Sequence, residues 1–334
     1  MNSRSKARLT LTIGIAVAAL FLWLSLRGTE LGEIRSALGD ANPIFVPFVA
    51  AALMLQFWFK AQRWGFFLKP FATGVTTRRV FPATVIGYLA NLVFPLYVGE
   101  LARAYVLGRH LNLEYSSVLA TTFLERLFDL LAILFIVGLV LGSGQQVPRE
   151  IEAVGQLAAL LSVVLILSLG AFLVWTKQLT HLAVTVTSAI SQRLGAVVAE
   201  QLALAGVGLS AVRNAHSIPK ILLVSLLQWA AMGACIIGGM LGTGVDAPWS
   251  AGFVVLALTV MAVTLPSSPG FFGTIQLSFA IGLSAYGVDP SLAFAASVYF
   301  HLTIYVVGWL AGLLFLRRSG TSLSGLREAA ERSE

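Results

Sequence analysis

Cysteine and charged residues are both scarce in this sequence. A single cysteine, Cys235, occurs in 334 residues, which excludes an internal disulfide and any metal site built from several cysteines. Only 11% of the residues are charged, whereas a soluble domain carries roughly 25%. Because 57% of the residues are hydrophobic and the mean hydropathy is +0.87, the composition predicts an integral membrane protein.

The short motifs of common enzyme chemistry are also missing. The sequence has no His-Glu-x-x-His, no paired cysteines, no glycine-rich phosphate loop ending in lysine and no aspartate-rich metal box. We therefore expect no metal and no cofactor. A membrane enzyme would have to work with Glu, Arg and Asp side chains, so these absences disfavour an enzymatic function but leave it open.

The net charge of +7 does not indicate nucleic-acid binding in this chain. The basic residues lie between apolar runs and form no cluster with interleaved aromatic residues. Membrane topology explains their positions better, because cytoplasmic loops carry an excess of Lys and Arg.

Six apolar runs are long enough to cross a hydrocarbon core of ~30 Å as helices. The first follows three basic residues and has no small-x-small cleavage site at its end, so we interpret it as a retained anchor and not as a signal peptide. The predicted spans are residues 9–26, 43–59, 117–141, 153–176, 220–241 and 292–316. Together they predict a transmembrane domain over residues 1–318, followed by a solvated cytoplasmic tail over 319–334.

Two further apolar regions, 80–112 and 250–287, are interrupted by proline and glycine. The first breaks between Pro95 and Gly99, and the second breaks between Thr264 and Gly273. If 80–112 returns to its starting side, most loop Lys and Arg lie on the cytoplasmic side with both termini, whereas a single crossing gives the outside the larger share. The fold class is therefore an all-α polytopic membrane protein with about six full spans and two broken or re-entrant helical hairpins in inverted orientation.

The loop after residue 176 is long and has apolar residues at helical spacing. The apolar residues at this spacing, with polar residues between them, are Leu179, Leu182, Val186, Ile190, Leu194 and Val197. This spacing fits an amphipathic helix on the cytoplasmic leaflet, and a packed helix is the alternative.

Charged residues beside the first break are the best candidates for a site. Ionisable groups in a membrane segment are costly and mark functional sites by default. Arg103 and Arg126 could hold an anionic head group, because a guanidinium grips phosphate and stays charged when partly dry. The alternative is an ion-pair network that joins the first hairpin to the next span. The candidate substrate-binding residues are Asn91, Glu100, Arg103, Glu125, Arg126 and Asp129.

The second break supplies a smaller set of candidates. Pro266, Pro269, Gly270 and Gly273 turn the chain, and the two glycines also allow a close approach of the backbone to a ligand. Gln276 is a candidate polar contact in a cavity. His301 is either a proton carrier or a hydrogen-bonded interior histidine.

The patterns N-x-x-x-P-x-x-x-G-E-x-x-R from Asn91 and E-R-x-x-D from Glu125, with the segment from Pro266 to Gly273, resemble the transmembrane, flippase-like region of lysylphosphatidylglycerol synthases. The similarity covers nearly the whole chain and is greatest to stand-alone, uncharacterised members. The family's second motif is nearer to Pro-Gly-Gly-x-Gly with a following acid, whereas this chain has Phe271 and Gln276. The soluble aminoacyl-transfer domain has no counterpart here.

This resemblance implies the handling of lipid head groups in the inner (cell) membrane. The leading hypothesis is a flippase-like translocator of an anionic phospholipid or a polyprenyl-phosphate-linked lipid, with membrane lipids and a lipid-modifying transferase as partners. The alternatives are a membrane-embedded transferase, with Glu125 or Asp129 as general base, and a scaffolding protein whose charges are structural.

Overall fold

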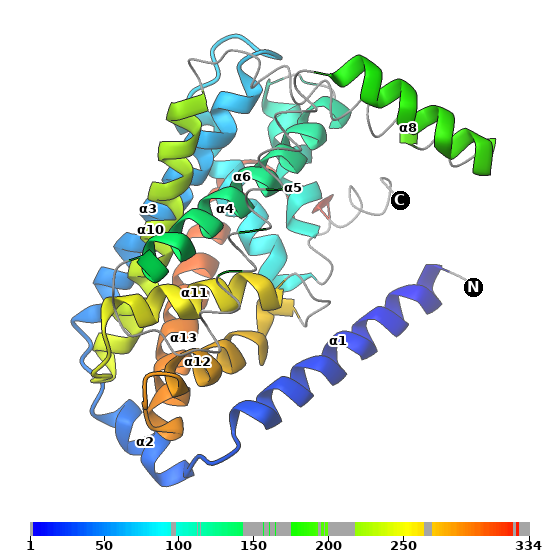
Figure 1. Ribbon diagram of the computed structural model, residues 1–334. Coiled ribbons are helices and arrows are strands. Elements are labelled where there is room, and N and C mark those ends of the chain that lie inside the picture. The colour runs from blue at the N-terminus through cyan, green and yellow to red at the C-terminus, as the bar shows by residue number, and fades with distance from the viewer. Residues whose placement is uncertain are drawn as a thin grey trace.

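The computed structural model describes residues 3–94, 98–111, 115–142, 175–192, 218–263 and 269–322, with scattered positions outside these ranges. Within them every regular element is helical (Figure 1). The elements are α1 Ser3–Ser25, α2 Leu31–Gly39, α3 Phe45–Leu68, α4 Thr77–Val93, α5 Val98–Leu111, α6 Tyr115–Gly142, α8 Thr176–Ile190, α10 Ile218–Gly242, α11 Trp249–Val263, the 3-10 turn η2 Pro269–Phe271, α12 Thr274–Ser284 and α13 Pro290–Arg318.

The predicted fold class is confirmed. Three helices, α3, α10 and α13, are long and apolar enough to cross a membrane, and α1, α6, α11 and α12 contain shorter apolar stretches. At ~1.5 Å per residue α13 is ~44 Å long, which matches a bilayer of ~40–45 Å including its head groups. The predicted span 153–176 lies almost entirely outside the described residues.

One span boundary predicted from the sequence is wrong. The predicted span 43–59 stops before Lys60, but α3 continues to Leu68 and carries Lys60 and Arg63 inside the bundle. A charged residue ends an apolar run in a hydropathy profile, although a helix can continue through it when the charge has a partner in the protein interior. Lys60 and Arg63, which the predicted boundary leaves in the loop after this span, therefore belong to the bundle.

Both broken regions form helical hairpins. α4 packs against α5, and α11 packs against α12, with the chain interrupted close to the predicted positions in each case. The turn η2 contacts α4, so the break of the second hairpin meets the first hairpin inside the molecule. The first residues of the second break, 264–268, lie outside the described part.

The two hairpins open toward opposite ends of the bundle. At one end, Leu68, Val75, Leu107, Ile221 and Leu316 pack together, which brings the open end of the α4–α5 hairpin to the ends of α3, α10 and α13. At the other end, the Asn42 N–H donates to the carbonyl of Gly242 over 2.7 Å, and the Tyr299 hydroxyl donates to the carbonyl of Asn42 over 2.8 Å. The α11–α12 hairpin opens there, as the inverted orientation requires.

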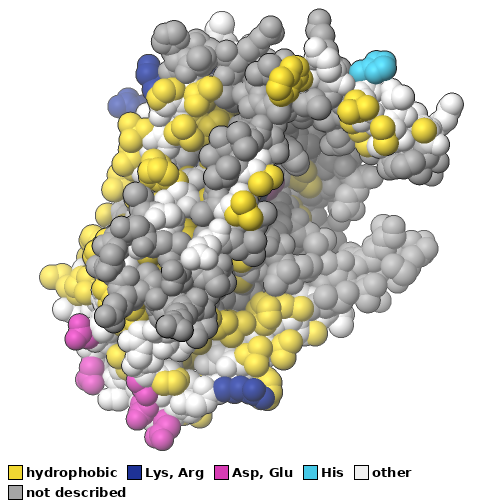
Figure 2. All heavy atoms as spheres, in the orientation of Figure 1, with side chains coloured by type: hydrophobic (Ala, Val, Ile, Leu, Met, Phe, Trp, Pro, Cys, Tyr) yellow, Lys and Arg dark blue, Asp and Glu magenta, His cyan; other side chains and the backbone are white. Residues whose placement is uncertain are grey.

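The two ends of the bundle differ in the predominant sign of their exposed charges. We call the first the basic end, because its exposed residues include Lys69, Arg78, Arg79, Arg109, Lys220, Arg317 and Arg318. The opposite end, the acidic end, carries the exposed Glu30, Glu33, Asp40, Asp246 and Asp289, together with two exposed arginines, Arg27 and Arg35. Figure 2 shows acidic side chains gathered at the end where α2 lies.

Close contacts of small residues hold the centre of the bundle together. α10 packs along α3 and also against α13. A Cβ at Gly239 of α10 would lie 2.6 Å from Cβ of Phe300 on α13, so this approach requires glycine. Packing of this kind drives helix association in membranes, where lipid is as apolar as the helix faces.

Two predicted peripheral features are partly described. α8 covers the start of the predicted amphipathic helix and lies at the edge of the molecule (Figure 1). Its Leu182 and Val186 are exposed. In the predicted tail, Leu326 is buried against the core at the basic end, and most of the segment lies outside the described residues. The leaflet location of α8 and the solvation of the tail stay predictions.

Candidate functional site

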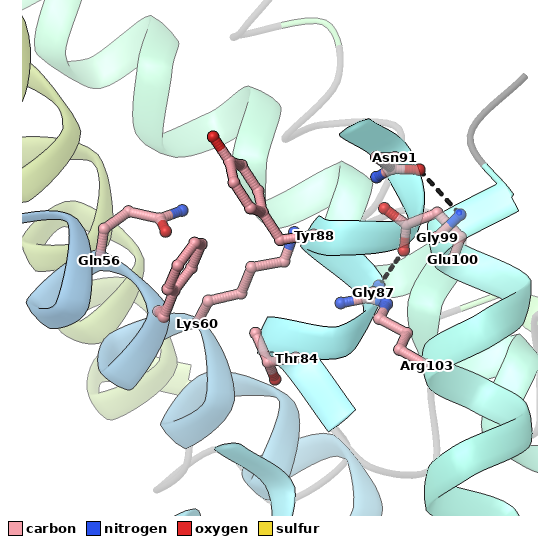
Figure 3. Close-up of a pocket in the computed structure, with 10 residues that line it drawn as sticks. Gln56, Lys60, Thr84, Gly87, Tyr88, Asn91, Gly99, Glu100 and Arg103 are labelled. Atoms are coloured by element: carbon pink, nitrogen blue, oxygen red, sulfur yellow. Dashed lines mark hydrogen bonds and ion pairs between the residues drawn. The ribbon is translucent and has the colours of Figure 1, made fainter. Parts of the chain in front are cut away.

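The first break is closed by a side chain that the sequence had singled out. The Gly99 N–H donates to Asn91 Oδ1 over 2.8 Å, so Asn91 satisfies a backbone donor that the interruption leaves without a helical partner (Figure 3). A Cβ at Gly99 would overlap the carbonyl oxygen of Gly87, and one at Gly87 would lie 2.9 Å from Cβ of Arg103. Glycine at both positions lets α5 approach α4 closely enough to place Arg103. Pro95 lies outside the described residues.

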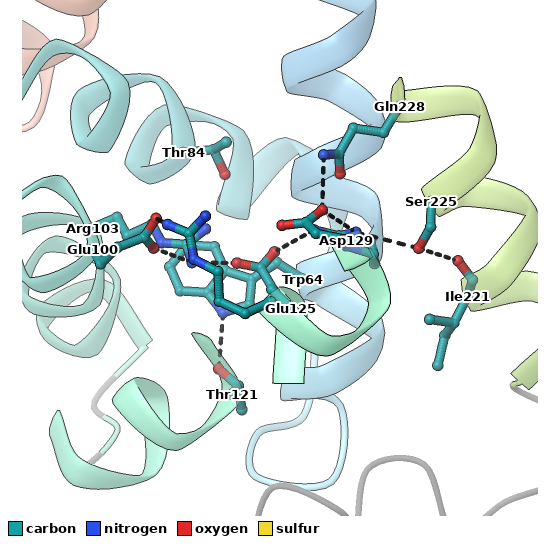
Figure 4. Close-up of polar contacts among 12 residues, drawn as sticks. Trp64, Thr84, Glu100, Arg103, Thr121, Glu125, Asp129, Ile221, Ser225 and Gln228 are labelled. Carbon is teal, nitrogen blue, oxygen red and sulfur yellow. Dashed lines mark hydrogen bonds and ion pairs between the residues drawn. The ribbon is translucent and has the colours of Figure 1, made fainter. Parts of the chain in front are cut away.

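Arg103 is the centre of a buried group of ion pairs. Its Nη2 pairs with carboxylate oxygens of Glu100 and Glu125, and the exposed fractions of Arg103 and Glu125 are only 3% and 1% (Figure 4). The guanidinium also stacks over the ring of Trp64, with 4.6 Å between Cζ and the ring centroid. Such a set is stable in a dry interior only while its members stay together, because a single buried charge is very costly.

Arg126 occupies the outer edge of this group. Its Nη2 lies 2.5 Å from Glu100 Oε1, but its side chain is 51% exposed. Glu100 therefore connects an exposed arginine with a buried one.

A second group, which the sequence analysis missed, lies around Asp129. Arg63 is fully buried, and its Nη1 is 2.7 Å from Asp129 Oδ1. The side chains of Gln228 and Trp229 on α10 also donate to Asp129, over 3.3 and 2.9 Å. Because Arg63 Nη2 lies 3.7 Å from Glu125 Oε1, Glu125 joins the two groups.

A cavity lies between α3, α4 and α5, beside Arg103. Its volume of about 40 Å³ holds a few water molecules and no lipid head group. Lys60 extends from α3 toward α4 in this cavity (Figure 3). The lining residues are Gln56, Phe57, Lys60, Thr84, Gly87, Tyr88, Asn91, Gly99, Glu100 and Arg103.

The cavity lies deep in the membrane segment. Lys60 is ~14 Å along the axis of α3 from Lys69 at the basic end. Since the hydrocarbon core is ~30 Å thick, this depth is close to its middle when the basic end lies at the interface. With the basic end at the interface, the charges around the cavity would lie inside the hydrocarbon core and not at its surface.

Side-chain hydrogen bonds hold the second break in a fixed shape. The Gly273 N–H donates to Gln276 Oε1 over 2.8 Å, and Gln276 Nε2 lies 3.1 Å from His301 Nδ1. His301 Nε2 lies 2.9 Å from the carbonyl oxygen of Gly270. A carbonyl oxygen only accepts, and an amide NH₂ only donates. This series of hydrogen bonds therefore requires a neutral His301 with its proton on Nε2. His301 is thus an interior, hydrogen-bonded histidine in this structure, and its role as a proton carrier stays a prediction.

The backbone conformation at Phe271 explains why glycine suits this position in the motif Pro-Gly-Gly-x-Gly. Phe271 has φ 61°, in the left-handed region, between Gly270 at φ 72° and Gly273 at φ 82°. A side chain there costs about 1–2 kcal/mol relative to a right-handed conformation, whereas glycine avoids this cost. Of the prolines predicted to turn the chain, Pro269 begins η2, and Pro266 lies outside the described residues.

The structure thus divides the predicted site residues into two sets. Asn91, Glu100, Arg103 and Glu125 come together with Arg126 at their edge, and Asp129 is joined to them through Arg63. Gly270, Gly273, Gln276 and His301 form a separate network in the second hairpin. No group of three or more His, Cys, Asp or Glu side chains suited to a metal ion occurs among the residues described.

Comparison with known proteins gives the chain a family. Over 99% of its length it is 27% identical to the glycosyltransferase AglD of Haloferax volcanii, and the match covers 58% of that protein. A UPF0104 membrane protein of Methanothermobacter thermautotrophicus is 32% identical over 41% of the chain and 42% of the relative. Another, from Methanocaldococcus jannaschii, is 22% identical over 64% of the chain and 87% of the relative.

The chain spans about half the length of the first two of these relatives. No solved structure matches it. The family model for the transmembrane region of lysylphosphatidylglycerol synthase matches residues 11–312, which is most of the chain. With its buried charges and paired broken hairpins, this multi-pass, lipid-related membrane protein belongs to the lysylphosphatidylglycerol synthase transmembrane region family.

Proposed function

We propose that the protein moves a lipid with an anionic, phosphate-containing head group between the leaflets of the cell membrane. The observation that carries this proposal is the cavity beside Arg103, which adjoins buried ion pairs near the middle of the membrane segment. Ionisable groups at such a depth are costly and mark substrate pathways. The substrate is an anionic phospholipid or a lipid with a polyprenyl-phosphate-linked head group.

Arg126, Glu100 and Arg103 form an inward series for a phosphate. The half-exposed guanidinium of Arg126 meets the head group first, and the phosphate then binds Arg103, whose Nε and Nη1 make no hydrogen bond to a described residue. A guanidinium suits both contacts because it binds phosphate in the same planar geometry as carboxylate. The hydrocarbon chains stay in the surrounding lipid.

The small cavity represents a closed state of this pathway. A volume of about 40 Å³ admits no head group, so entry requires the α4–α5 hairpin to separate from α3. The α11–α12 hairpin opens toward the opposite end and contacts the first hairpin through η2. Two inverted broken hairpins that meet inside the membrane support alternating access to one site.

The distribution of charge supports an orientation. Exposed Lys and Arg gather at the basic end, where α13 ends, and cytoplasmic segments carry this excess. The acidic end then faces outward, and both termini lie in the cytoplasm. Cysteine variants at exposed positions of the two ends, labelled with a membrane-impermeant thiol reagent in intact cells, test this orientation.

Reconstitution tests the transport activity. Vesicles that contain the protein should expose an inner-leaflet fluorescent anionic lipid to an external quencher faster than empty vesicles do. Arg103→Ala should lose this acceleration. Arg78→Ala, which changes an exposed residue at the start of α4, is the matched control and should keep it. Equal rates in empty and loaded vesicles across a panel of anionic lipids would defeat the proposal.

A membrane-embedded transferase is the second candidate, favoured by the relative named glycosyltransferase AglD. In that case Glu125 or Asp129 would act as general base on a lipid-linked substrate. Mass spectrometry of lipids from cells with and without the gene separates the two functions. A lipid species that appears or disappears supports the transferase, whereas unchanged species with altered sidedness support translocation. In the second outcome, a separate lipid-modifying transferase would be the partner that supplies the substrate.

A further inference from the structure

We infer that Lys60 is a direct contact for the negative charge of the substrate, and that the cavity between α3, α4 and α5, widened when the α4–α5 hairpin separates from α3, is a binding site for a single phosphodiester group. This inference rests on the proposed function for the lipid as the source of that group. It adds a residue that neither the sequence motifs nor the family resemblance single out.

Among the described residues of the cluster, Lys60 is the cation without a carboxylate partner. Each arginine of the cluster has a carboxylate: Arg63 pairs with Asp129, Arg103 with Glu125, and Arg126 with Glu100. Lys60 forms no ion pair with any acidic side chain in the part of the chain that the structure describes. One positive charge is thus in excess, and it lies on a residue that lines the cavity.

Arg103, which also lines the cavity, has two nitrogen atoms without a hydrogen-bond partner among the described residues. Its Nε and Nη1 are buried and make no hydrogen bond to a described residue, although its Nη2 is engaged by two carboxylates. Buried donors are nearly always satisfied, so these groups require water or a ligand as a partner. A phosphate oxygen in the cavity would satisfy a donor of Arg103 and neutralise Lys60 at once.

The same residues disfavour a cationic head group. Glu100 also lines the cavity, but it is already paired with Arg103 and Arg126. A cation placed there would add to the unpaired charge of Lys60 at a depth where solvent screens it poorly. One excess positive charge matches the single negative charge of a phosphodiester.

Binding in detergent tests the role of Lys60 without any transport step. The purified full chain is titrated with dihexanoyl phosphatidylglycerol, and native mass spectrometry measures the bound fraction. Lys60→Gln should weaken binding about tenfold or more, since a charge-assisted hydrogen bond contributes ~1.5–3 kcal/mol. Lys60→Arg should keep most of the affinity. Lys69→Gln, an exposed lysine just beyond the same helix, should bind like the wild type.

Four further ligands identify what the site recognises. Dihexanoyl phosphatidylcholine, whose head group has no net charge, should bind at least tenfold more weakly than the anionic lipid. Glycerol phosphate and inorganic phosphate test whether a phosphate without acyl chains is sufficient. Binding of either one at the affinity of the anionic lipid makes a soluble phosphate the source of the group. Stronger binding of an aminoacylated, cationic phosphatidylglycerol would overturn the inference.

Chemical protection of the wild type covers the case in which Lys60→Gln does not fold. Acetylation of Lys60 by an amine-reactive reagent should slow when the anionic lipid is added, while acetylation of Lys69 should not. Unchanged acetylation of Lys60 at saturating lipid, or unchanged affinity of a folded Lys60→Gln variant, rejects the role of Lys60. Specific binding without accelerated transport in vesicles leaves the site in place and removes the translocator function, so the two failures can be told apart.

Discussion

Arg63 and Asp129 form a buried ion pair, 2.7 Å between Nη1 and Oδ1, between two helices whose charges look unrelated in the sequence. Ser225 of α10 lies 3.3 Å from the same guanidinium nitrogen, and Gln228 and Trp229 bind the carboxylate. The pair therefore joins α3, α6 and α10 at one level of the bundle. Because Arg63 also faces Glu125, it sets the charge balance beside the cavity as well.

Removing the charge of Arg63 should destabilise the folded protein more than most single substitutions do. Arg63→Met leaves the Asp129 carboxylate buried without its charge partner, which costs ~3–5 kcal/mol. We expect a large drop in folded yield and in the thermal unfolding temperature in detergent. The double variant Arg63→Met with Asp129→Asn should recover part of the loss, because no lone charge then remains. An unchanged melting temperature for Arg63→Met alone would show that this pair does not hold the helices together.

Alanine at Gly99 should disrupt the first hairpin. The added Cβ meets the backbone oxygen of Gly87, which cannot move away without displacing α4. We expect a loss of stability of ~1–3 kcal/mol, the usual range for overpacking. The control is Gly138→Ala in α6, where an added Cβ meets no described atom within 4 Å. Thermal unfolding of both variants in the same detergent measures the difference, and equal melting temperatures would contradict the close approach of the two helices.

The two breaks use the same device, since a carboxamide oxygen accepts from a glycine N–H in each: Asn91 for Gly99 and Gln276 for Gly273. Gln276→Leu removes the acceptor and leaves the Gly273 N–H and His301 Nδ1 without partners, at ~1–3 kcal/mol for each unsatisfied group. We expect a lower melting temperature and faster hydrogen exchange at Gly273. Gln178→Leu on the exposed side of α8 is the control. If exchange at Gly273 stays at the wild-type rate, Gln276 does not hold the second break.

Apolar length and positions of proline and glycine were enough to predict most of the fold. The breaks at Pro95 to Gly99 and Thr264 to Gly273 fall where the structure interrupts its hairpins, because a residue that cannot continue a helix acts locally. The small helix α2 was missed. Its nine residues are too few for a span, and it is held by long-range contacts such as that between Glu33 and Ser291.

The charged site was only half visible in the sequence. Glu100, Arg103 and Glu125 stood out because apolar residues surround them. Lys60 and Arg63 lie at the end of an apolar run and looked like the start of a cytoplasmic loop. Only their partners on α5, α6 and α10 show that they are interior, and no pattern within α3 carries that information. A buried charged residue can therefore be predicted from the sequence only when apolar residues both precede and follow it in the same segment.

Arg126→Ala should separate capture of the substrate from folding. The side chain is 51% exposed and pairs with Glu100 at the edge of the cluster, and such pairs contribute only ~0–1 kcal/mol to stability. We expect a melting temperature close to that of the wild type. In vesicles, the rate at saturating lipid should be nearly kept, while half-saturation should need several-fold more anionic lipid, because the first contact for the phosphate is gone. A variant that transports like the wild type at low lipid would place the entry of the head group away from Arg126. A variant that is unstable would make this arginine part of the ion-pair framework that Arg103 and Glu125 build.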